Sequence, residues 1–457
     1  MSDFTIGELE TWNERIETLA REKGLDFYPQ EFEICSYEEM LGYEAYTGMP
    51  SHYPHWSFGK TFDRLHTYYR YNLSGLPYEM VINSNPCLAY LMRDNTLLLQ
   101  ILTIAHVYGH NDFFKNNRLF KTTRAELTLE TFKNHAERIR GYIQDPSIGY
   151  LKVERILDAA HAVRYQANRT PGRRRLTVAE EKERILTGYQ RRTQPDQFGI
   201  PASSEAAPDL TKIPLEPEED LLWFIAEYGQ LEEWERDLLR IVRAETEYFM
   251  PQIESKIINE GWASFWHYRL LQELHLAPEL NLEFLKRHHQ VIRPHPNGLN
   301  PYHIGFCILT DIERRFNSAK LFEAREIEND HSFIRRYLTR ELCEELHLFE
   351  FLSSEDSIVI TEVADEEGWE KIRETLAKQT GIGAIPVIKV KSLAPKERCL
   401  ILEHEYDGRE LELSYAEETL KYLVELWGRP VELITYHNNQ ERRITCREDK
   451  VITLFES

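Results

Sequence analysis

The sequence predicts an α+β protein, with a mostly helical N-terminal domain over residues 1–350 and a small C-terminal α/β domain over residues 355–457. Two observations support this prediction. Most of the N-terminal part has apolar side chains at helical spacing, in segments that end at glycine or proline-rich sequence. The C-terminal part instead has short segments in which apolar and polar residues alternate, as they do in β-strands.

The first predicted element is an amphipathic helix at residues 8–24, which ends at Gly24. Residues 25–60 are rich in Tyr, Phe, Pro and Gly, and we expect short helices and ordered loops there. A strand is expected at residues 76–83, before a turn-like Ser-Asn-Pro sequence. Residues 88–114 have an apolar face at helical spacing and predict a long helix. Further helices are expected at residues 124–144 and 150–165.

The middle of the chain changes in composition at residues 168–219, which contain many Pro, Gly and Ser residues. This composition predicts a flexible insertion around one helix, near residues 177–189. Helical spacing resumes from Asp220 to about Leu274, and a break is expected at Pro251.

Residues 286–306 are rich in His, Pro and Asn and predict a loop, after which residues 308–350 are expected to be helical. In the C-terminal domain, two segments ended by glycine predict helices, WEKIRETLAKQTG and YAEETLKYLVELWG. The expected strands are DSIVI, IPVIKV, RCLILEHEY, PVELITYH and KVITLF.

The composition excludes several classes of protein. Hydrophobic residues make up 42% of the 457 residues and charged residues 29%, which is typical of a globular chain and not of a disordered one. The net charge of −21 argues against binding to nucleic acid or to an anionic membrane surface. The longest apolar window, Leu97 to Val107, is too short to cross a bilayer. The acidic first residues do not resemble a signal peptide, and the six cysteines are widely spaced, so we expect a cytoplasmic protein with free thiols.

The first group of candidate functional residues is AHVYGHNDFF, in which His106 and His110 are four residues apart. On a helix this spacing places both imidazoles on one face, where they can bind the same metal ion. The alternative is a pair of histidines that hydrogen bond within a polar part of the core.

The second candidate is Glu260, which lies among aromatic residues in the segment NEGWASFWHYR. A buried carboxylate needs a partner, and either a metal ion or an ion pair with Lys256 or an arginine would satisfy it. His267 follows two helical turns later on the same face.

Two histidines at this spacing and a carboxylate from a later helix form the ligand set of a zinc peptidase of the zincin type. The sequence EGWA resembles the second metal motif of some bacterial zinc peptidases. We therefore expect His106, His110 and Glu260 to bind one divalent metal ion, most simply zinc. One departure matters, because the general base of HExxH is replaced here by Val107, which cannot accept a proton.

Three interpretations follow from this departure. Another group could act as the base, and Glu79, Asp112 and His267 are the candidates, with Glu79 and His267 preferred. The metal could instead be structural. The third interpretation is a two-histidine, one-carboxylate iron(II) site, although nothing in the sequence indicates an oxygenase.

The loop predicted at residues 286–306 carries His288, His289 and His303 in addition to the residues that we expect to contact a substrate. Loops on a rigid framework often carry binding groups, whereas the alternative is a solvated loop with turn-forming asparagines. The predicted substrate-binding residues are His295, Asn300 and Tyr302.

Taken together, these motifs resemble the stage V sporulation protein R family of bacteria over nearly the whole chain. The sequences that carry the resemblance are GLDFYPQEFEI, HYPHWSFGK, YEMVINSNP, AHVYGHNDFFKNN, EGWASFWHYR and NPYHIGF. The resemblance implies a role in endospore formation, at the stage when the peptidoglycan cortex is made, and a location in the cytoplasm of the mother cell. It also supports the histidine pair and the EGWA segment as parts of one site.

The resulting expectation is a metal-binding protein that is needed for formation of the spore cortex. If it is an enzyme, we expect metal-assisted hydrolysis of an amide or peptide bond in a cell-wall-related molecule. The alternative is a non-catalytic scaffold or regulator, in which the metal joins two helices and the C-terminal domain binds a protein partner.

Overall fold

The computed structural model describes residues 4–70, 79–169, 174–193, 206–294, 298–354 and 357–456, and for residues 79, 350–354, 357–361 and 456 it describes the backbone alone. Packing divides the chain into two compact units, and each unit is built from two segments of sequence. Unit 1 comprises Met1–Gly141 and Tyr248–Ala384, and unit 2 comprises Tyr142–Glu247 and Ile385–Ser457.

This division differs from the sequence-based boundary near residue 355. The strand-like pattern begins there, but helix α16 (Gly368–Gln379) packs against α14 (Asp330–Tyr337) in unit 1. One side-chain contact between the two helices is the hydrogen bond from His331 to the backbone oxygen of Ala377, at 2.9 Å. A change in sequence pattern therefore marks a change in local structure and not a boundary between packed units.

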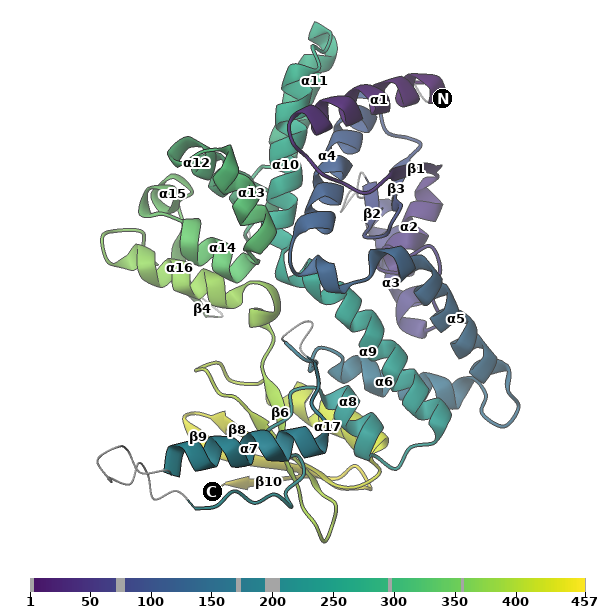
Figure 1. Ribbon diagram of the computed structural model, residues 1–457, viewed down its shortest axis with the longest axis vertical. Coiled ribbons are helices and arrows are strands. Elements are labelled where there is room, and N and C mark those ends of the chain that lie inside the picture. The colour runs from purple at the N-terminus through teal and green to yellow at the C-terminus, as the bar shows by residue number, and fades with distance from the viewer. Residues whose placement is uncertain are drawn as a thin grey trace. The chain divides into compact units, whose positions relative to one another are not determined.

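Unit 1 is mostly helical, and side-chain caps define where several of its helices start. Thr5 and Ser36 each form a capping box with a glutamate three residues later, at the first and second helices. Thr96 caps the helix that carries the histidine pair. The remaining helices of this unit, some labelled in Figure 1, are α1 (Ile6–Glu22), α2 (Tyr37–Ala45), α3 (Trp56–Arg70), α4 (Leu97–Asn116), α5 (Thr128–Gln144, which continues beyond the unit), α10 (Lys256–Glu273), α11 (Pro278–Val291), α12 (Pro301–Arg315), α13 (Ser318–Ile327) and α15 (Arg340–Glu345).

A small sheet in unit 1 has the strand order β1-β3-β2, in which β1 (Gln30–Cys35) is parallel and β2 (Glu79–Ile82) antiparallel to β3 (Cys87–Met92). The strand expected at residues 76–83 is confirmed over β2, whereas residues 76–78 lie outside the described residues. The long helix expected from residue 88 is wrong at its start, because residues 87–92 form the central strand and α4 begins only at Leu97. A short, fully buried strand is continuously apolar, so its periodicity cannot be told from that of a buried helix.

The loop predicted at residues 286–306 is also corrected by the structure. Helix α11 extends to Val291 and α12 starts at Pro301, so residues 286–291 and 301–306 of the predicted loop are helical. Both helices begin with a proline in their first turn, where the missing N–H costs nothing. Of the residues whose types indicated a loop, Asn300 and Pro301 belong instead to the start of α12, whereas Pro294 lies outside a helix. A second hairpin in this unit consists of β4 (Phe349–Ser354) and β5 (Ser357–Val363).

Unit 2 contains a five-stranded sheet with the order β10-β9-β8-β7-β6. Strands β7 and β8 are parallel, and the other neighbours are antiparallel. Helix α17 packs against β8 and β9, and α6 packs against α17. The sequence predicted every strand of this sheet except β9, whose charged residues obscure the alternation. The elements are α6 (Tyr150–Val163), α7 (Val178–Thr193), α8 (Leu221–Tyr228), α9 (Glu233–Glu254, which continues beyond the unit), β6 (Ile388–Leu393), β7 (Leu400–His404), α17 (Leu413–Trp427), β8 (Val431–His437), β9 (Gln440–Cys446) and β10 (Ile452–Glu456).

Two further expectations concern the middle of the chain. The helix predicted near residues 177–189 is confirmed as α7, whereas residues 170–173 and 194–205 of the predicted flexible insertion lie outside the described residues. The helix break expected at Pro251 occurs four residues later, at Ser255. The Ser255 hydroxyl donates a hydrogen bond to the Pro251 carbonyl at 2.7 Å, which satisfies one of the last acceptors of α9.

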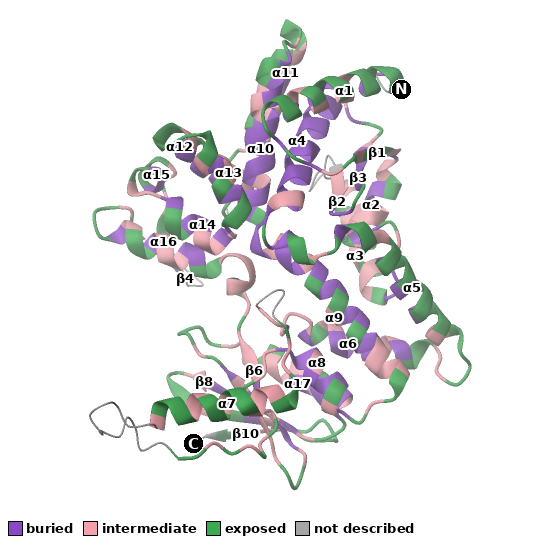
Figure 2. Cartoon of the chain, viewed as in Figure 1, coloured by how far each residue is buried: buried purple, intermediate pink, exposed green. Residues whose placement is uncertain are grey.

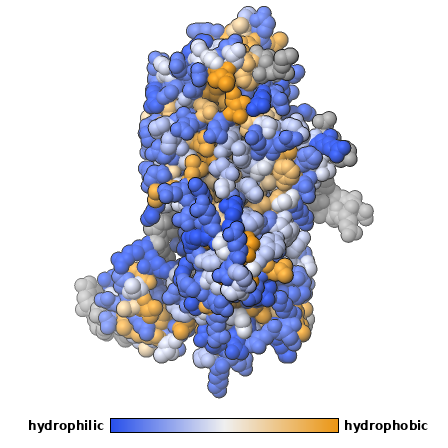
Figure 3. Space-filling model, turned by 90° about the vertical axis from the view of Figure 1, so that its right-hand side faces the viewer, coloured by the Kyte–Doolittle hydropathy of each residue, from blue (hydrophilic) through white to orange (hydrophobic). Residues whose placement is uncertain are grey.

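The core of unit 1 surrounds helices α4 and α10, which are buried along most of their length (Figure 2). On the face in Figure 3, hydrophilic residues predominate and hydrophobic ones are interspersed among them, in keeping with the high content of charged residues. Among the described residues, no helix is both long and apolar enough to cross a membrane. All six cysteines are free thiols.

Candidate metal centre

Helix α4 presents two histidines inside the core of unit 1. Seventeen of its 20 residues are buried, so the helix is enclosed on every side and not only along one face. His106 is 3% exposed and His110 4% exposed. Two imidazoles in such an environment need polar partners, because an unsatisfied buried polar group is costly.

Helix α10 contributes the carboxylate, and its start is held by Asp330. The two oxygens of Asp330 accept hydrogen bonds from the backbone N–H groups of Ile257 and Ile258, each at 2.9 Å. These N–H groups belong to the first turn, where no partner exists within the helix. The cap therefore fixes the turn that precedes Glu260.

Small residues within the motifs let the helices approach closely. A Cβ atom on Gly109 would lie 2.7 Å from the Cα atom of Ala263, so the close contact between α4 and α10 requires glycine at this position. A Cβ atom on Gly261 would lie 2.5 Å from the backbone of Gly305, so the close contact between α10 and α12 also requires glycine. The glycines of HVYGH, EGWA and HIGF are thus required by backbone packing around the site.

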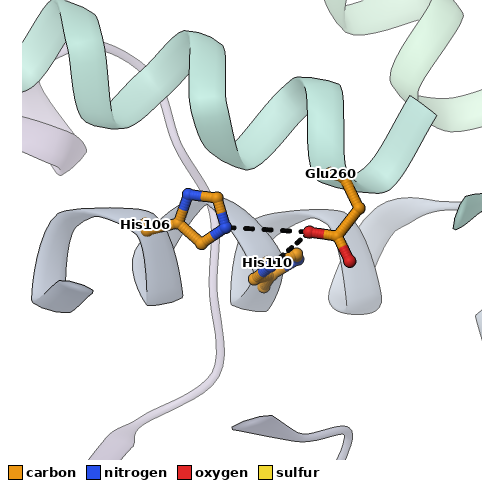
Figure 4. A group of neighbouring side chains, drawn as sticks. All are labelled: His106, His110 and Glu260. Carbon is orange, nitrogen blue, oxygen red and sulfur yellow. Dashed lines mark ion pairs between the residues drawn. The ribbon is translucent and has the colours of Figure 1, made fainter. Parts of the chain in front are cut away.

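The three predicted ligands meet between α4 and α10 (Figure 4). The Nε2 atoms of His106 and His110 lie 3.8 Å and 3.4 Å from Oε2 of Glu260, and all three donor atoms are within 4.8 Å of one another. Ligands about 2.0–2.2 Å from a tetrahedral ion are roughly 3.3–3.6 Å apart. The arrangement is therefore close to the spacing that a bound metal ion requires.

The charge state of Glu260 also suits a ligand. Burial raises the pKa of its carboxyl group, but the neighbouring imidazoles of His106 and His110 outweigh this effect and hold the pKa below its ordinary value. Its Oε2 atom is fully buried and accepts no hydrogen bond from any described residue. An ionised oxygen of this kind, facing two ring nitrogens, is the donor that a divalent cation would satisfy.

Neighbouring side chains orient the two imidazoles. The Nδ1 atom of His110 is 3.0 Å from Oδ1 of Asn259, and an amide oxygen can only accept a hydrogen bond. His110 can therefore donate the proton on its Nδ1 atom to this oxygen, which leaves the lone pair of Nε2 for a metal ion. On the other imidazole, Nδ1 of His106 lies 2.9 Å from Nδ1 of His267.

The candidate bases occupy different positions. His267 is fully buried and lies beside Nδ1 of His106, the ring nitrogen that does not face Glu260, and burial lowers its pKa well below the ordinary value. Glu79 begins β2, and its backbone is opposite Leu91, but its side chain lies outside the described residues. Val107 is fully buried and supplies no acceptor.

Asp112, the third candidate base, is engaged in the core. It accepts hydrogen bonds from the Arg325 guanidinium at 2.7 Å, from the Trp262 indole at 2.8 Å and from the backbone N–H of Asp26 at 2.8 Å. Burial raises the pKa of Asp112 to about 6, and the charge of Arg325 opposes this rise. Its contacts join α4 to α10 and α13 and indicate a structural role.

The predicted substrate-binding residues separate in the structure. The ring of Tyr302 stacks on that of His106 with a centroid distance of 6.0 Å, so this half-buried residue lies beside the candidate site. Asn300 caps α12, and its amide group bonds to the backbone of Val291, Arg293 and Tyr302. His295 lies outside the described residues.

Sequence reasoning missed one residue of this site and placed another in the wrong kind of element. Asn259 could have been noticed as a second polar residue directly before Glu260, in a stretch of helix with apolar residues on both sides. His288 was assigned to a loop, whereas it lies in α11 with its Nδ1 atom 2.8 Å from Nε2 of His267. The Pro and Asn residues that follow His288 in the sequence led us to predict a loop where α11 continues.

Comparison with known proteins identifies relatives of the whole chain. Residues 3–385 match the family model described as SpoVR like protein, and residues 386–438 match the SpoVR-like C-terminal domain. These two models meet close to the start of the second segment of unit 2, at Ile385. The chain is also 33% identical over 477 residues to the Escherichia coli (strain K12) protein named uncharacterized protein YcgB, a match that covers 94% of this chain and 92% of that protein. No solved structure matches the chain, so a zincin-like relationship stays a prediction.

Proposed function

This chain belongs to the SpoVR family, and on that premise we propose that it is a metal-dependent protein of a sporulation-related process. The single observation that carries the proposal is the meeting of His106, His110 and Glu260. Their donor atoms come from α4 and α10, which are far apart in the sequence, and lie within 4.8 Å of one another in the core. Burial of this set without a cation would leave a carboxylate between two imidazoles.

Zinc is the proposed ion, because two imidazoles and one carboxylate with room for a further ligand are the usual set of a catalytic zinc site. A bound zinc ion would polarise a carbonyl group and make water more acidic. We propose hydrolysis of an amide or peptide bond in a molecule related to peptidoglycan, in the cytoplasm of the mother cell, during formation of the spore cortex. Tyr302, stacked beside His106, is proposed to contact the substrate.

The proposed reaction needs a proton acceptor, since Val107 stands where HExxH has its glutamate. Glu79 is our proposed base. His267 lies behind His106 and is less suited to the task, because its two ring nitrogens already face other imidazoles. A Glu79→Gln variant should keep its zinc and lose function in a complementation assay, and full function would remove Glu79 from the mechanism.

Elemental analysis of the purified chain tests the metal centre directly. We expect about one equivalent of zinc in the wild type and loss of that zinc in His106→Ala and Glu260→Ala variants that remain folded. A His331→Ala variant is the matched control, because it removes a histidine of unit 1 that hydrogen bonds to the backbone of Ala377. Absence of stoichiometric metal after reconstitution with zinc and with iron would overturn the proposal.

A second candidate function is a non-catalytic scaffold or regulator, in which the metal joins α4 to α10 and the chain acts through a protein partner. The burial of Val107 favours it, since the position of the usual base is filled by an apolar side chain that packs in the core. Complementation of a deletion strain separates the two functions. Restoration by Glu79→Gln together with failure of His110→Ala would favour the scaffold.

A further inference from the structure

Three buried imidazoles form a hydrogen-bonded chain that begins at the candidate metal centre. His106 on α4, His267 on α10 and His288 on α11 follow one another, with nitrogen–nitrogen distances of 2.9 Å and 2.8 Å. Their exposed fractions are 3%, 0% and 1%. Such a chain, contributed by three separate helices, is expensive to bury unless each contact is satisfied.

The hydrogen-bonding capacity of the rings gives this chain a direction. Each nitrogen–nitrogen contact holds one proton, so one ring donates and the other accepts. If Nε2 of His106 faces a metal ion with its lone pair, the proton of that ring is on Nδ1 and is donated to His267. His267 then carries its own proton on Nε2 and donates it to Nδ1 of His288. One choice at the metal therefore sets the tautomer of all three rings.

Packing holds the far end of the chain in place. The His288 ring stacks on Tyr268 at a centroid distance of 4.5 Å and meets the edge of Phe306 at 5.1 Å. These aromatic contacts leave His288 little freedom to rotate, so it presents Nδ1 to His267 in a fixed direction. His288 on α11 does not contact His106 on α4 directly. It is connected to His106 through His267.

The two proposed histidine ligands are held by different neighbouring side chains. His110 is oriented by Asn259, whereas His106 depends on His267 and His288. Beside this chain on α10 lies Ser264, fully buried between Glu260 and His267, with no hydrogen bond to a described residue. Polar groups thus continue along the face of α10 that carries Glu260 and His267, which a purely structural helix contact would not need.

We propose that His267 and His288 are positioning residues of the metal centre, which hold His106 with its proton on Nδ1 and its Nε2 lone pair toward the ion. This inference rests on the proposed function, because it assumes that His106 is a ligand. Residues that orient a metal-bound histidine typically contribute about 10–100-fold to metal affinity. Since His288 acts only through His267, loss of both should cost no more than loss of His267 alone.

Zinc affinity of the full chain, measured by competition with a chromophoric chelator, tests this order of action. We expect His267→Leu to weaken zinc binding about 10–100-fold and His288→Leu to weaken it less. The double variant should match His267→Leu, and this non-additivity is the signature of a chain. His267→Gln keeps an acceptor and a donor and should recover part of the affinity, which a change in packing alone would not do.

Two controls keep the inference distinct from the proposed function. His331→Leu removes a histidine of the same unit away from the chain and should leave zinc affinity unchanged. The absorption spectrum of the cobalt(II)-loaded protein should change in His267→Leu and His288→Leu but not in His331→Leu. If His267→Leu does not fold, His288→Leu and His267→Gln carry the test.

Each outcome decides one of the two claims. Wild-type protein that binds no zinc overturns the proposed function and this inference with it. Wild-type protein that binds zinc, with equal affinity and an unchanged cobalt spectrum in the His267 and His288 variants, overturns the inference alone. Additive losses in the double variant would show that His288 does not act through His267.

Discussion

Replacement of Gly109 by alanine should separate the two helices that form the candidate metal centre. The added Cβ atom would lie 2.7 Å from the Cα atom of Ala263, whereas carbon atoms in ordinary contact are about 3.5–4.0 Å apart. Because the obstacle is backbone, α4 and α10 must move apart by roughly 1 Å. The nitrogen–oxygen distances between the ligands, now 3.4 Å and 3.8 Å, would grow with them.

The expected effect on metal binding exceeds the effect on stability. Metal–ligand distances tolerate only about ±0.2 Å, so we expect zinc affinity to fall by about tenfold or more. Overpacking costs about 1–3 kcal/mol, but alanine gains up to about 1 kcal/mol over glycine within a helix. The net loss in the free energy of unfolding of the metal-free chain should therefore be about 0–2 kcal/mol.

Zinc affinity by chelator competition and urea unfolding of the metal-free chain measure the two effects. Gly42→Ala is the matched control, since Gly42 lies in α2 of the same unit and an added Cβ atom would meet nothing within 4 Å. We expect it to leave zinc affinity unchanged and to stabilise the chain by about 0.4–1 kcal/mol. Wild-type zinc affinity in Gly109→Ala would refute the reasoning, because the close helix contact would then not determine the ligand spacing.

Three further predictions concern the core around the site. Burial raises the folded-state pKa of Asp330 to about 7, so the folded chain retains a proton that the unfolded chain releases above about pH 4. The free energy of unfolding should therefore fall as pH rises from about 4 to about 7, by up to about 1.4 kcal/mol per pH unit. Urea unfolding of Asp330→Asn should show a weaker dependence on pH. Arg325→Met leaves the buried Asp112 carboxylate without its cation and should lower the free energy of unfolding in urea by roughly 3–5 kcal/mol. Arg21→Met, at an exposed ion pair, should lower it by less than about 1 kcal/mol. Equal losses would contradict the structural role of Asp112. Removal of zinc with a chelator should lower the melting temperature of the wild type but not of Glu260→Ala, and the same shift in both would place the stabilising metal elsewhere.

Much of the secondary structure follows from local signals in the sequence. Side-chain caps and terminal glycines identify α1 and α17, because capping residues satisfy backbone groups within a few positions. The errors arise where two structures share one local pattern. The apolar run at residues 87–92 suits a buried strand as well as a helix, and the sheet partners β1 and β2 on either side decide between them.

The three proposed ligands were predictable because their types and spacing have a chemical meaning. Two histidines four residues apart share one helix face, and a glutamate among aromatic residues requires a partner. The parts that were not predictable depend on contacts between distant segments. Asn259 lies beside His110, and His288 beside His267, only because α10 and α11 pack beside α4.

The sequence by itself determined the helix that carries His106 and His110, the carboxylate suited to join them, and the absence of a base at Val107. Only the tertiary structure decided that these groups meet, that His267 lies beside His106, and that unit 1 is assembled from two separated segments. The physical reason is that helix periodicity and capping act over a few residues. Packing, by contrast, depends on backbone approach at positions such as Gly109 and Gly261, and the partner at each position comes from elsewhere in the chain.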